Sequence, residues 1–134
     1  MTGEFAKGLE ALDAIFEFLG EFGDRYQLDE QTRFCLDLVA EELFTNTVKY
    51  GSGKDNRVLI RIEKAGRRLR LEVVDRDAKP FDLSSVEPLP ALAPVEEKRP
   101  GGLGLHLIRS LVDEVASEYK DGEMRIWVTK ILES

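Results

Sequence analysis

The sequence is poor in the residues that support disulfide and zinc sites. It contains one cysteine, Cys35, and one histidine, His106, among 134 residues. A single cysteine excludes an internal disulfide framework and fits a reducing compartment. A lone histidine without a cysteine cluster argues against a zinc site. Cys35 stands among apolar neighbours, which favours an inert core thiol over a reactive one.

Long apolar runs and an excess of basic residues are also missing. No stretch approaches about 18 consecutive apolar residues, so the sequence predicts no membrane span. Residues 1–20 lack the basic start and long apolar core of a signal peptide. The formal net charge is -7, whereas binding to a nucleic-acid backbone needs a basic surface. These absences predict an acidic protein of the cytoplasm with neither a membrane nor a nucleic acid as partner.

The residues that are present suit one globular domain over 1–134. The length allows a sizeable core, and 43% of the residues are hydrophobic. The patterns predict an amphipathic helix over 5–26 and a second helix that is capped by Asp29 and ends near Tyr50. Strands follow at 57–63 and 67–75, with a turn at Ala65-Gly66 between them. The rest of the chain is predicted as a proline-rich loop over 82–100, a short helix over 103–113 and two strands joined across 120–122. This order predicts an α+β fold, a two-layer α/β sandwich with the helices on one face of a mostly antiparallel sheet.

The second predicted helix contains two adjacent glutamates that fall on different faces. At helical spacing, Glu41 lies on a charged, solvated stripe, whereas Glu42 lies on an inward stripe together with Asn46. The solvated stripe comprises Glu30, Arg33, Asp37 and Glu41, and the inward stripe comprises Cys35, Leu38, Val39, Glu42, Asn46 and Lys49. A carboxylate on an inward face usually has a partner or a task. Glu42 is therefore either functional, or it pairs with Lys49 or reaches solvent past the sheet edge.

Residues 101–111 read GGLGLHLIRSL and place three glycines before a predicted helix. Gly101, Gly102 and Gly104 lack Cβ atoms, so a ligand can approach the backbone closely, although each glycine weakens a helix by about 1 kcal/mol. The helix N-terminus that follows favours an anion such as a phosphate. Alone, the pattern is weak and also fits a tight turn, and it lacks the lysine and hydroxyl residue of a P-loop.

The order of these motifs is more specific than any one of them. The segments EELFTNTVKYG, EVVDRDAKPFD and GGLGLHLIRSLVDEV, with the proline-rich loop between the last two, resemble the GHKL (histidine kinase-like) ATPase superfamily. Within it, the sequence is most similar to the anti-sigma factor serine kinases, over nearly the whole chain. The resemblance implies the Bergerat (GHKL-type) ATPase fold. It also implies a protein serine kinase that uses ATP and Mg²⁺, phosphorylates a small antagonist protein and binds a sigma factor.

The resemblance implies roles for individual residues. Asn46 matches the asparagine that holds Mg²⁺. Glu42 matches the carboxylate that acts as general base on the attacking hydroxyl. Asp75 matches the aspartate that accepts a hydrogen bond from the adenine amino group. The three glycines match the box whose backbone wraps the phosphates.

Two positions outside these motifs complete the predicted site. Thr129 lies on the last predicted strand, and its position alone is the reason for predicting that it binds adenine. Arg99, which follows Lys98 just before the glycines, could meet phosphate charge, although a solvated loop cation fits equally well.

The aspartate box departs from the family pattern. In DRDAKPFD, Asp77 stands where the first glycine is expected and Lys79 where the next could be, and Asp75 lies one residue too far from Pro80-Phe81. This spacing indicates either an insertion or a rewritten adenine pocket. A second carboxylate near a nucleotide adds repulsion unless a cation such as Lys79 screens it.

Two functions from different classes therefore stay open. Glu42, Asn46 and the glycines favour the kinase, whereas the altered aspartate box favours a binding module of the same fold that holds a partner without phosphoryl transfer. A partner surface is expected on the first predicted helix, where Phe18 lies off the main apolar stripe. That surface predicts a homodimer or a sigma-factor contact. The alternative is that Phe18 is a single exposed residue that takes part in no interface.

Overall fold

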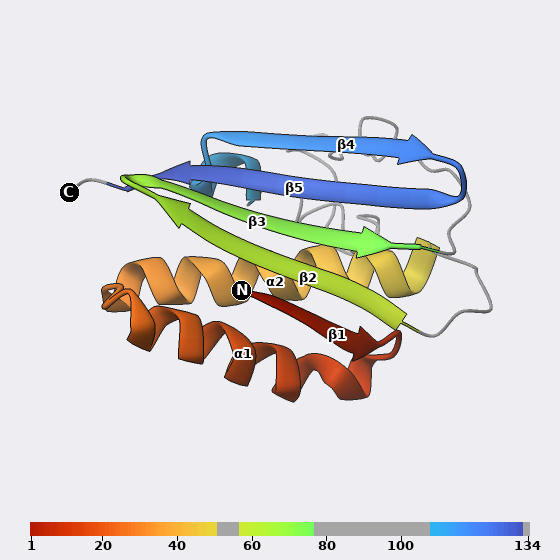
Figure 1. The fold of residues 1–134 in the computed structure, drawn as a ribbon, viewed down its shortest axis with the longest axis horizontal. Helices are drawn as coiled ribbons and strands as arrows, with labels where there is room; N and C mark the ends of the chain where they lie inside the picture. Colours follow the sequence, from red (N-terminus) through yellow and green to blue (C-terminus); the bar gives the residue numbers. More distant parts are fainter. Residues whose placement is uncertain (51–56, 77–107, 133–134) are drawn as a thin grey trace, which may run out of the picture.

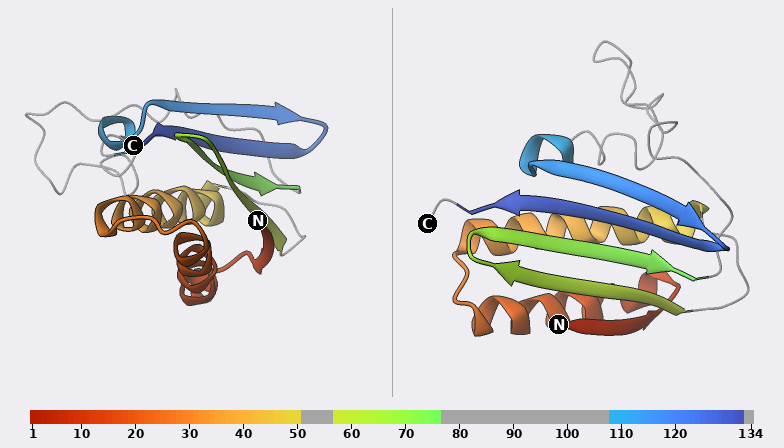
Figure 2. Two further views of the ribbon diagram at one scale, coloured as in Figure 1. Left: turned by 60° about the vertical axis from the view of Figure 1, so that its left-hand side comes forward. Right: turned by 45° about the horizontal axis from the view of Figure 1, so that its top comes forward.

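In the part of the chain that the structure describes, a five-stranded sheet carries two long helices on one face. The computed structural model describes residues 1–50, 57–76 and 108–132. The elements in chain order are β1 (Thr2–Ala6), the 3-10 turn η1 (Leu9–Ala11), α1 (Leu12–Arg25), α2 (Glu30–Tyr50), β2 (Arg57–Ala65), β3 (Arg68–Asp75), β4 (Glu114–Lys120) and β5 (Glu123–Ile131). The strands are antiparallel in the order β1-β2-β3-β5-β4. Both helices lie against the same face (Figures 1 and 2), so the predicted α+β sandwich is confirmed.

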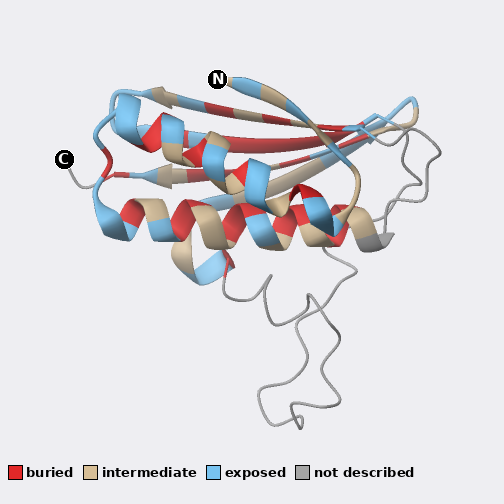
Figure 3. Cartoon of the chain, turned by 90° about the horizontal axis from the view of Figure 1, so that it is seen from below, coloured by how far each residue is buried: buried red, intermediate tan, exposed pale blue. Residues whose placement is uncertain are grey.

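The core lies between the helices and the sheet. Figure 3 shows the buried stripe of each helix turned toward the strands. The side chains that share this layer and are less than 2% exposed include Ile15, Phe22, Val39, Leu43 and Phe44 of the helices, and Ile60, Ile62, Leu71, Val73 and Ile126 of the strands. Aliphatic residues at every second strand position and every third or fourth helix position meet in this layer, because those two periods each give one apolar face.

The start of α2 is where the sequence predicts it. The Oδ1 atom of Asp29 accepts a hydrogen bond from the backbone N–H of Thr32 at 2.7 Å, as a helix N-cap does. Arg33, predicted on the solvated stripe, is instead half-buried and joins the two helices. Its guanidinium donates to the carbonyls of Gly23 and Leu28, both at 2.9 Å. These carbonyls lie in the last turn of α1 and in the link to α2, where carbonyls lack helical partners, so the arginine is drawn inward.

Both hairpins have the turn residues that their backbone requires. The β2–β3 turn lies at Gly66, with φ of +60°, and Arg67, one residue later than predicted. The β4–β5 turn lies at Asp121 and Gly122, with φ of +53° and +80°, within the predicted 120–122. Glycine and aspartate tolerate these left-handed conformations better than other residues. Of the predicted helix over 103–113, residues 108–111 are helical and 103–107 lie outside the described residues.

The prediction of one helix over 5–26 is wrong at its beginning. Residues 2–6 form β1, an edge strand in which Phe5 lies opposite Val58 of β2, and α1 begins only at Leu12. A short apolar segment fits both a helical and an alternating pattern, so periodicity could not separate them. The available edge of β2 decides in favour of a strand, because pairing satisfies the backbone groups of both segments.

Phe18 is covered by this strand. The Phe5 and Phe18 rings meet edge to face with centroids 5.5 Å apart, and both side chains pack against the core. The prediction of a partner surface assumed that Phe18 has no neighbour within the chain. That assumption is wrong, because Phe5 of β1 packs against it.

Substitution of Phe18 tests this packing. We expect Phe18→Ala to lower the free energy of unfolding by about 2 kcal/mol, because it removes a partly buried ring and its aromatic partner. Phe34→Ala in α2 is the matched control: Phe34 is 69% exposed, and its loss should change stability by less than about 0.5 kcal/mol. Urea denaturation measures both values, and equal losses would contradict the packing.

Candidate functional site

Each sheet residue belongs to one of two sides. In β3, alternation places Leu69, Leu71, Val73 and Asp75 on the side that faces the helices. The residues between them, including Arg70 and Glu72, belong to the side away from the helices, here called the open side. A site can combine strand residues with α2 residues only on the helix-facing side.

Asn46 and Glu42 lie one turn apart near the C-terminal end of α2. Asn46 is only 1% exposed, and among the described residues neither of its amide atoms has a hydrogen-bond partner. Glu42 is half-buried with its Oε1 shielded from solvent, whereas Glu41 is exposed. The predicted difference between the two glutamates is therefore confirmed. Asp37, predicted as solvated, is half-buried, and burial together with the Glu41 charge raises the pKa of its carboxyl.

The unpaired amide of Asn46 is an unusual feature of a folded core. A buried polar group without a partner costs about 1–3 kcal/mol, and such groups are rare enough to need an explanation. Its Oδ1 is an oxygen donor of the kind that hard divalent cations take. The residue therefore fits a bound group that supplies the partner missing among the described residues.

Asp75 lies at the end of β3 and is paired within the chain. Its Oδ2 is 2.7 Å from the Nζ of Lys7, and the two side chains are 2% and 6% exposed. Sequence reasoning missed Lys7, which it placed inside a helix. No local pattern joins the two residues, since only the β1–β2–β3 pairing brings them together.

Three predicted site residues share one end of the molecule. Figures 1 and 2 show the last turns of α2 and the end of β3 at the same end of the molecule. Glu42 and Asn46 belong to the second half of α2, and Asp75 is the last residue of β3. The other predicted residues of this group, Arg99, Gly101, Gly102 and Gly104, lie outside the described residues, as do Asp77 and Lys79.

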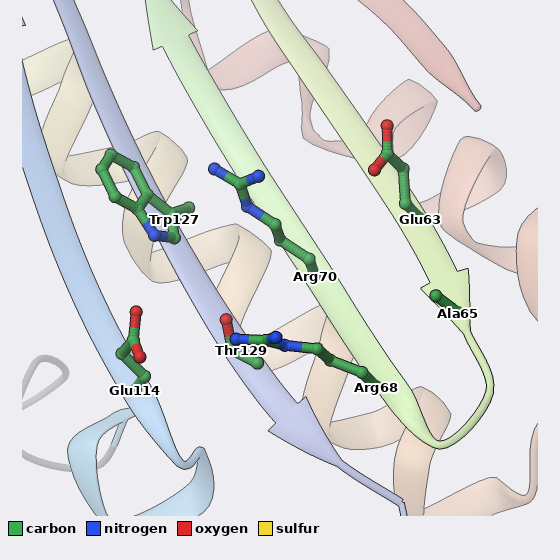
Figure 4. Close-up of a pocket in the computed structure, with 7 residues that line it drawn as sticks. All are labelled: Glu63, Ala65, Arg68, Arg70, Glu114, Trp127 and Thr129. Atoms are coloured by element: carbon green, nitrogen blue, oxygen red, sulfur yellow. The ribbon is translucent and has the colours of Figure 1, made fainter.

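Thr129 does not join this group. It lies opposite Arg70 in the β3–β5 register, which places it on the open side of the sheet, away from Asp75. There it lines a shallow hollow of about 400 Å³ with Arg68, Arg70, Glu114 and Trp127, as Figure 4 shows. Its assignment to the adenine pocket rested on position along the strand, and strand alternation turns the side chain the other way.

The open side carries its own charge network around a buried glutamate. Glu72, 3% exposed, lies 3.1 Å from Arg70, 3.6 Å from Arg125 and 3.8 Å from Arg61. The Arg70 guanidinium also lies over the ring of Trp127, 5.2 Å from its centroid. These ion pairs offset the charge of the buried carboxylate, and its Oε1 has no hydrogen-bond partner among the described residues.

Other chemistries find little support among the described residues. Cys35 is 6% exposed, and burial raises the pKa of its thiol, as expected of an inert core cysteine. No group of three or more histidine, cysteine, aspartate or glutamate residues in the described ranges could hold a metal ion. Within those ranges, no helix has the length and apolar character needed to cross a bilayer.

The buried pair of Lys7 and Asp75 predicts a strong coupling in stability. Asp75→Asn or Lys7→Met alone is expected to lower the free energy of unfolding by about 3 kcal/mol, because each leaves an uncompensated buried charge. The double variant should lose less than the sum by at least about 1 kcal/mol. Denaturant unfolding of all four proteins measures the coupling.

The exposed pair of Glu4 and Arg76, whose side chains are 52% and 55% exposed, provides the control for this cycle. Glu4→Gln and Arg76→Met should be additive within about 0.5 kcal/mol. Additive losses at Lys7 and Asp75 as well would contradict the buried pair.

Known proteins resemble this chain in sequence and in fold. Residues 5–130 match the family model of the histidine kinase-like ATPase domain. The serine/threonine-protein kinase BtrW of Bordetella bronchiseptica is 25% identical over 121 residues, which cover 89% of this chain and 84% of that protein.

Solved structures show the same fold at lower identity. The RsbU and RsbW domains of Rv1364c from Mycobacterium tuberculosis superpose with a TM-score of 0.72 at 17% identity, over 98% of this chain and 31% of that one, so this chain spans about a third of its length. The histidine kinase AdeS of Acinetobacter baumannii superposes with a TM-score of 0.55 at 14% identity, over 100% of this chain and 68% of that one. Because the family model covers nearly the whole sequence and the fold agrees, this chain belongs to the histidine kinase-like ATPase domain family.

Proposed function

We propose that this chain is an ATP-dependent protein serine kinase that acts as an anti-sigma factor. It would phosphorylate a serine of a small antagonist protein and bind a sigma factor. The observation that carries the proposal is the buried Asn46, whose amide has no hydrogen-bond partner among the described residues, one turn beyond Glu42. Membership of an ATPase domain family and the similarity to a serine/threonine-protein kinase support it.

Asn46 fits the role of a magnesium ligand. Its Oδ1 would contact Mg²⁺ directly, which compensates an oxygen that has no donor among the described residues. The ion, when bound, supplies positive charge that neutralises the phosphates of ATP. Following the resemblance, the backbone of Gly101, Gly102 and Gly104 and the guanidinium of Arg99 would bind the same phosphates.

Glu42 fits the role of general base. The serine hydroxyl oxygen of the antagonist forms a bond to the γ-phosphorus of ATP, the bond to the leaving β-phosphate oxygen breaks and releases ADP, and Glu42 accepts the hydroxyl proton. Its half-buried position limits competition from water. Asp75 would accept a hydrogen bond from the 6-amino group of adenine.

The partners belong to the same proposal. With a sigma factor and an antagonist protein as its partners, the chain would act in the cytoplasm. A homodimer would be compatible with either contact. Because Phe18 is covered by Phe5, these contacts would use surfaces other than the one expected at Phe18.

A second function, a partner-binding module without phosphoryl transfer, is favoured by one observation. The carboxylate proposed to read adenine is already paired with Lys7 at 2.7 Å. If that pair blocked the base pocket, the fold would still present its surfaces to a protein partner.

Nucleotide binding separates the two functions. We expect ATP with Mg²⁺, at about 100 times its dissociation constant, to raise the melting temperature by about 5 °C or more, because a ligand of the native state stabilises it. Asn46→Ala should abolish most of this shift, since it removes the proposed metal ligand. Gln31→Ala, at the exposed start of α2, should leave the shift unchanged. An unchanged melting temperature in millimolar ATP and Mg²⁺ would end the nucleotide proposal.

The adjacent glutamates test the proposed base. Glu42→Gln is expected to keep ATP affinity and lower the rate of phosphoryl transfer to the antagonist serine by roughly 10²–10⁴-fold. Glu41→Gln, one residue away and exposed, should have almost no effect. Transfer of radiolabelled phosphate measures both rates. If the effects were reversed, the proposed base would be wrong, and if the unmodified protein bound ATP without any transfer, the binding module would be correct.

A further inference from the structure

We propose that Lys7 is a base-specificity residue, and that it lets the nucleotide pocket accept 6-oxopurine nucleotides about as well as adenine nucleotides. The inference rests on the proposed function, because it assumes that Asp75 faces position 6 of the purine. The observation that carries it is the buried ion pair between Lys7 and Asp75.

The backbone holds Lys7 at this position. Val58 of β2 lies opposite Phe5 of β1 on one side and opposite Asp75 of β3 on the other. Lys7 follows β1 directly, and the chain turns there, since the N–H of Gly8 donates to the carbonyl of Ala6 at 2.9 Å. Strand pairing therefore brings the base of the lysine side chain to the end of β3, where Asp75 lies.

Burial makes the pair effective. Its side chains are 6% and 2% exposed, whereas those of the Arg76–Glu4 pair nearby in sequence are 55% and 52% exposed. Charges removed from water interact more strongly and are screened less by salt. A purine that contacts Asp75 would therefore encounter the ammonium as well as the carboxylate.

A carboxylate alone discriminates strongly at position 6. It accepts a hydrogen bond from the 6-amino group of adenine, but it has no proton to give to a 6-oxo group, and the two sets of lone pairs repel each other. An unpaired buried acceptor is costly, so a carboxylate that stands alone would exclude hypoxanthine and guanine nucleotides.

The ammonium of Lys7 changes this balance. It carries three N–H donors, so it can donate to Asp75 and to a second acceptor at the same time. A 6-oxo group then finds a donor, and the positive charge cancels the repulsion from the carboxylate. A carboxylate also offers about four acceptor positions, so a 6-amino group can still donate to Asp75. The pair therefore matches either substituent.

Inosine triphosphate isolates this effect, because it has the 6-oxo group of GTP without the 2-amino group. We expect its dissociation constant, measured by titration calorimetry with Mg²⁺, to be within about tenfold of that of ATP. Lys7→Met should raise the ratio of the inosine to the adenine constant by about tenfold or more, the cost of an unpaired acceptor. Lys7→Arg, which keeps charge and donors, should change the ratio less than Lys7→Met, and Lys120→Met, an exposed lysine at the end of β4, should leave it unchanged.

The outcomes separate the two proposals. Tight ATP binding with an inosine constant more than tenfold weaker would overturn the role of Lys7 and leave the proposed kinase intact. A ratio that Lys7→Met changes by less than tenfold would also overturn it. If Lys7→Met does not fold, the ratio of the inosine to the adenine constant is compared between the unmodified protein and Lys7→Arg. A ratio within about tenfold in both supports the role of Lys7, and a larger ratio in the unmodified protein overturns it. If neither nucleotide binds, the proposed function fails, and the specificity inference fails with it.

Discussion

Packing of α2 against the centre of the sheet is the constraint on which the rest of the structure depends. The helix packs on β3, the middle strand of the sheet, and its inward side chains, such as Leu43 and Phe44, are wholly buried. This burial sets the rotation of the helix about its axis. Because Glu41 and Glu42 differ by about 100° around that axis, the same packing exposes one glutamate and draws the other inward, together with the buried amide of Asn46.

The N-terminal strand completes the other half of the arrangement. β1 pairs with the edge of β2, covers Phe18 through Phe5, and delivers Lys7 to Asp75. An edge strand left unpaired exposes a row of backbone donors and acceptors, so β1 contributes to the sheet as well as to the site. One short segment thus removes an apolar surface from solvent and changes the chemistry of the proposed base pocket.

The two sides of the sheet have separate roles. The helix-facing side combines an apolar core with polar residues at one end, and Asn46 has polar atoms that the described chain does not satisfy. On the open side, Glu72 is compensated by three arginines, one of which stacks on Trp127. Asn46 of α2 and the arginine network around Glu72 of β3 therefore lie on opposite sides of the sheet.

The sequence alone determined the features that depend on local periodicity and on motifs. The N-cap at Asp29, both hairpins, the different faces of Glu41 and Glu42, and the family resemblance could all be predicted, because each depends on neighbours in the chain or on a motif. Only the tertiary structure decided that residues 2–6 form a strand, that Arg33 turns inward, that Thr129 points away from Asp75, and that Lys7 pairs with Asp75. Each of these depends on which segments lie side by side after folding, and the periodicity of a single sequence contains no signal for such contacts.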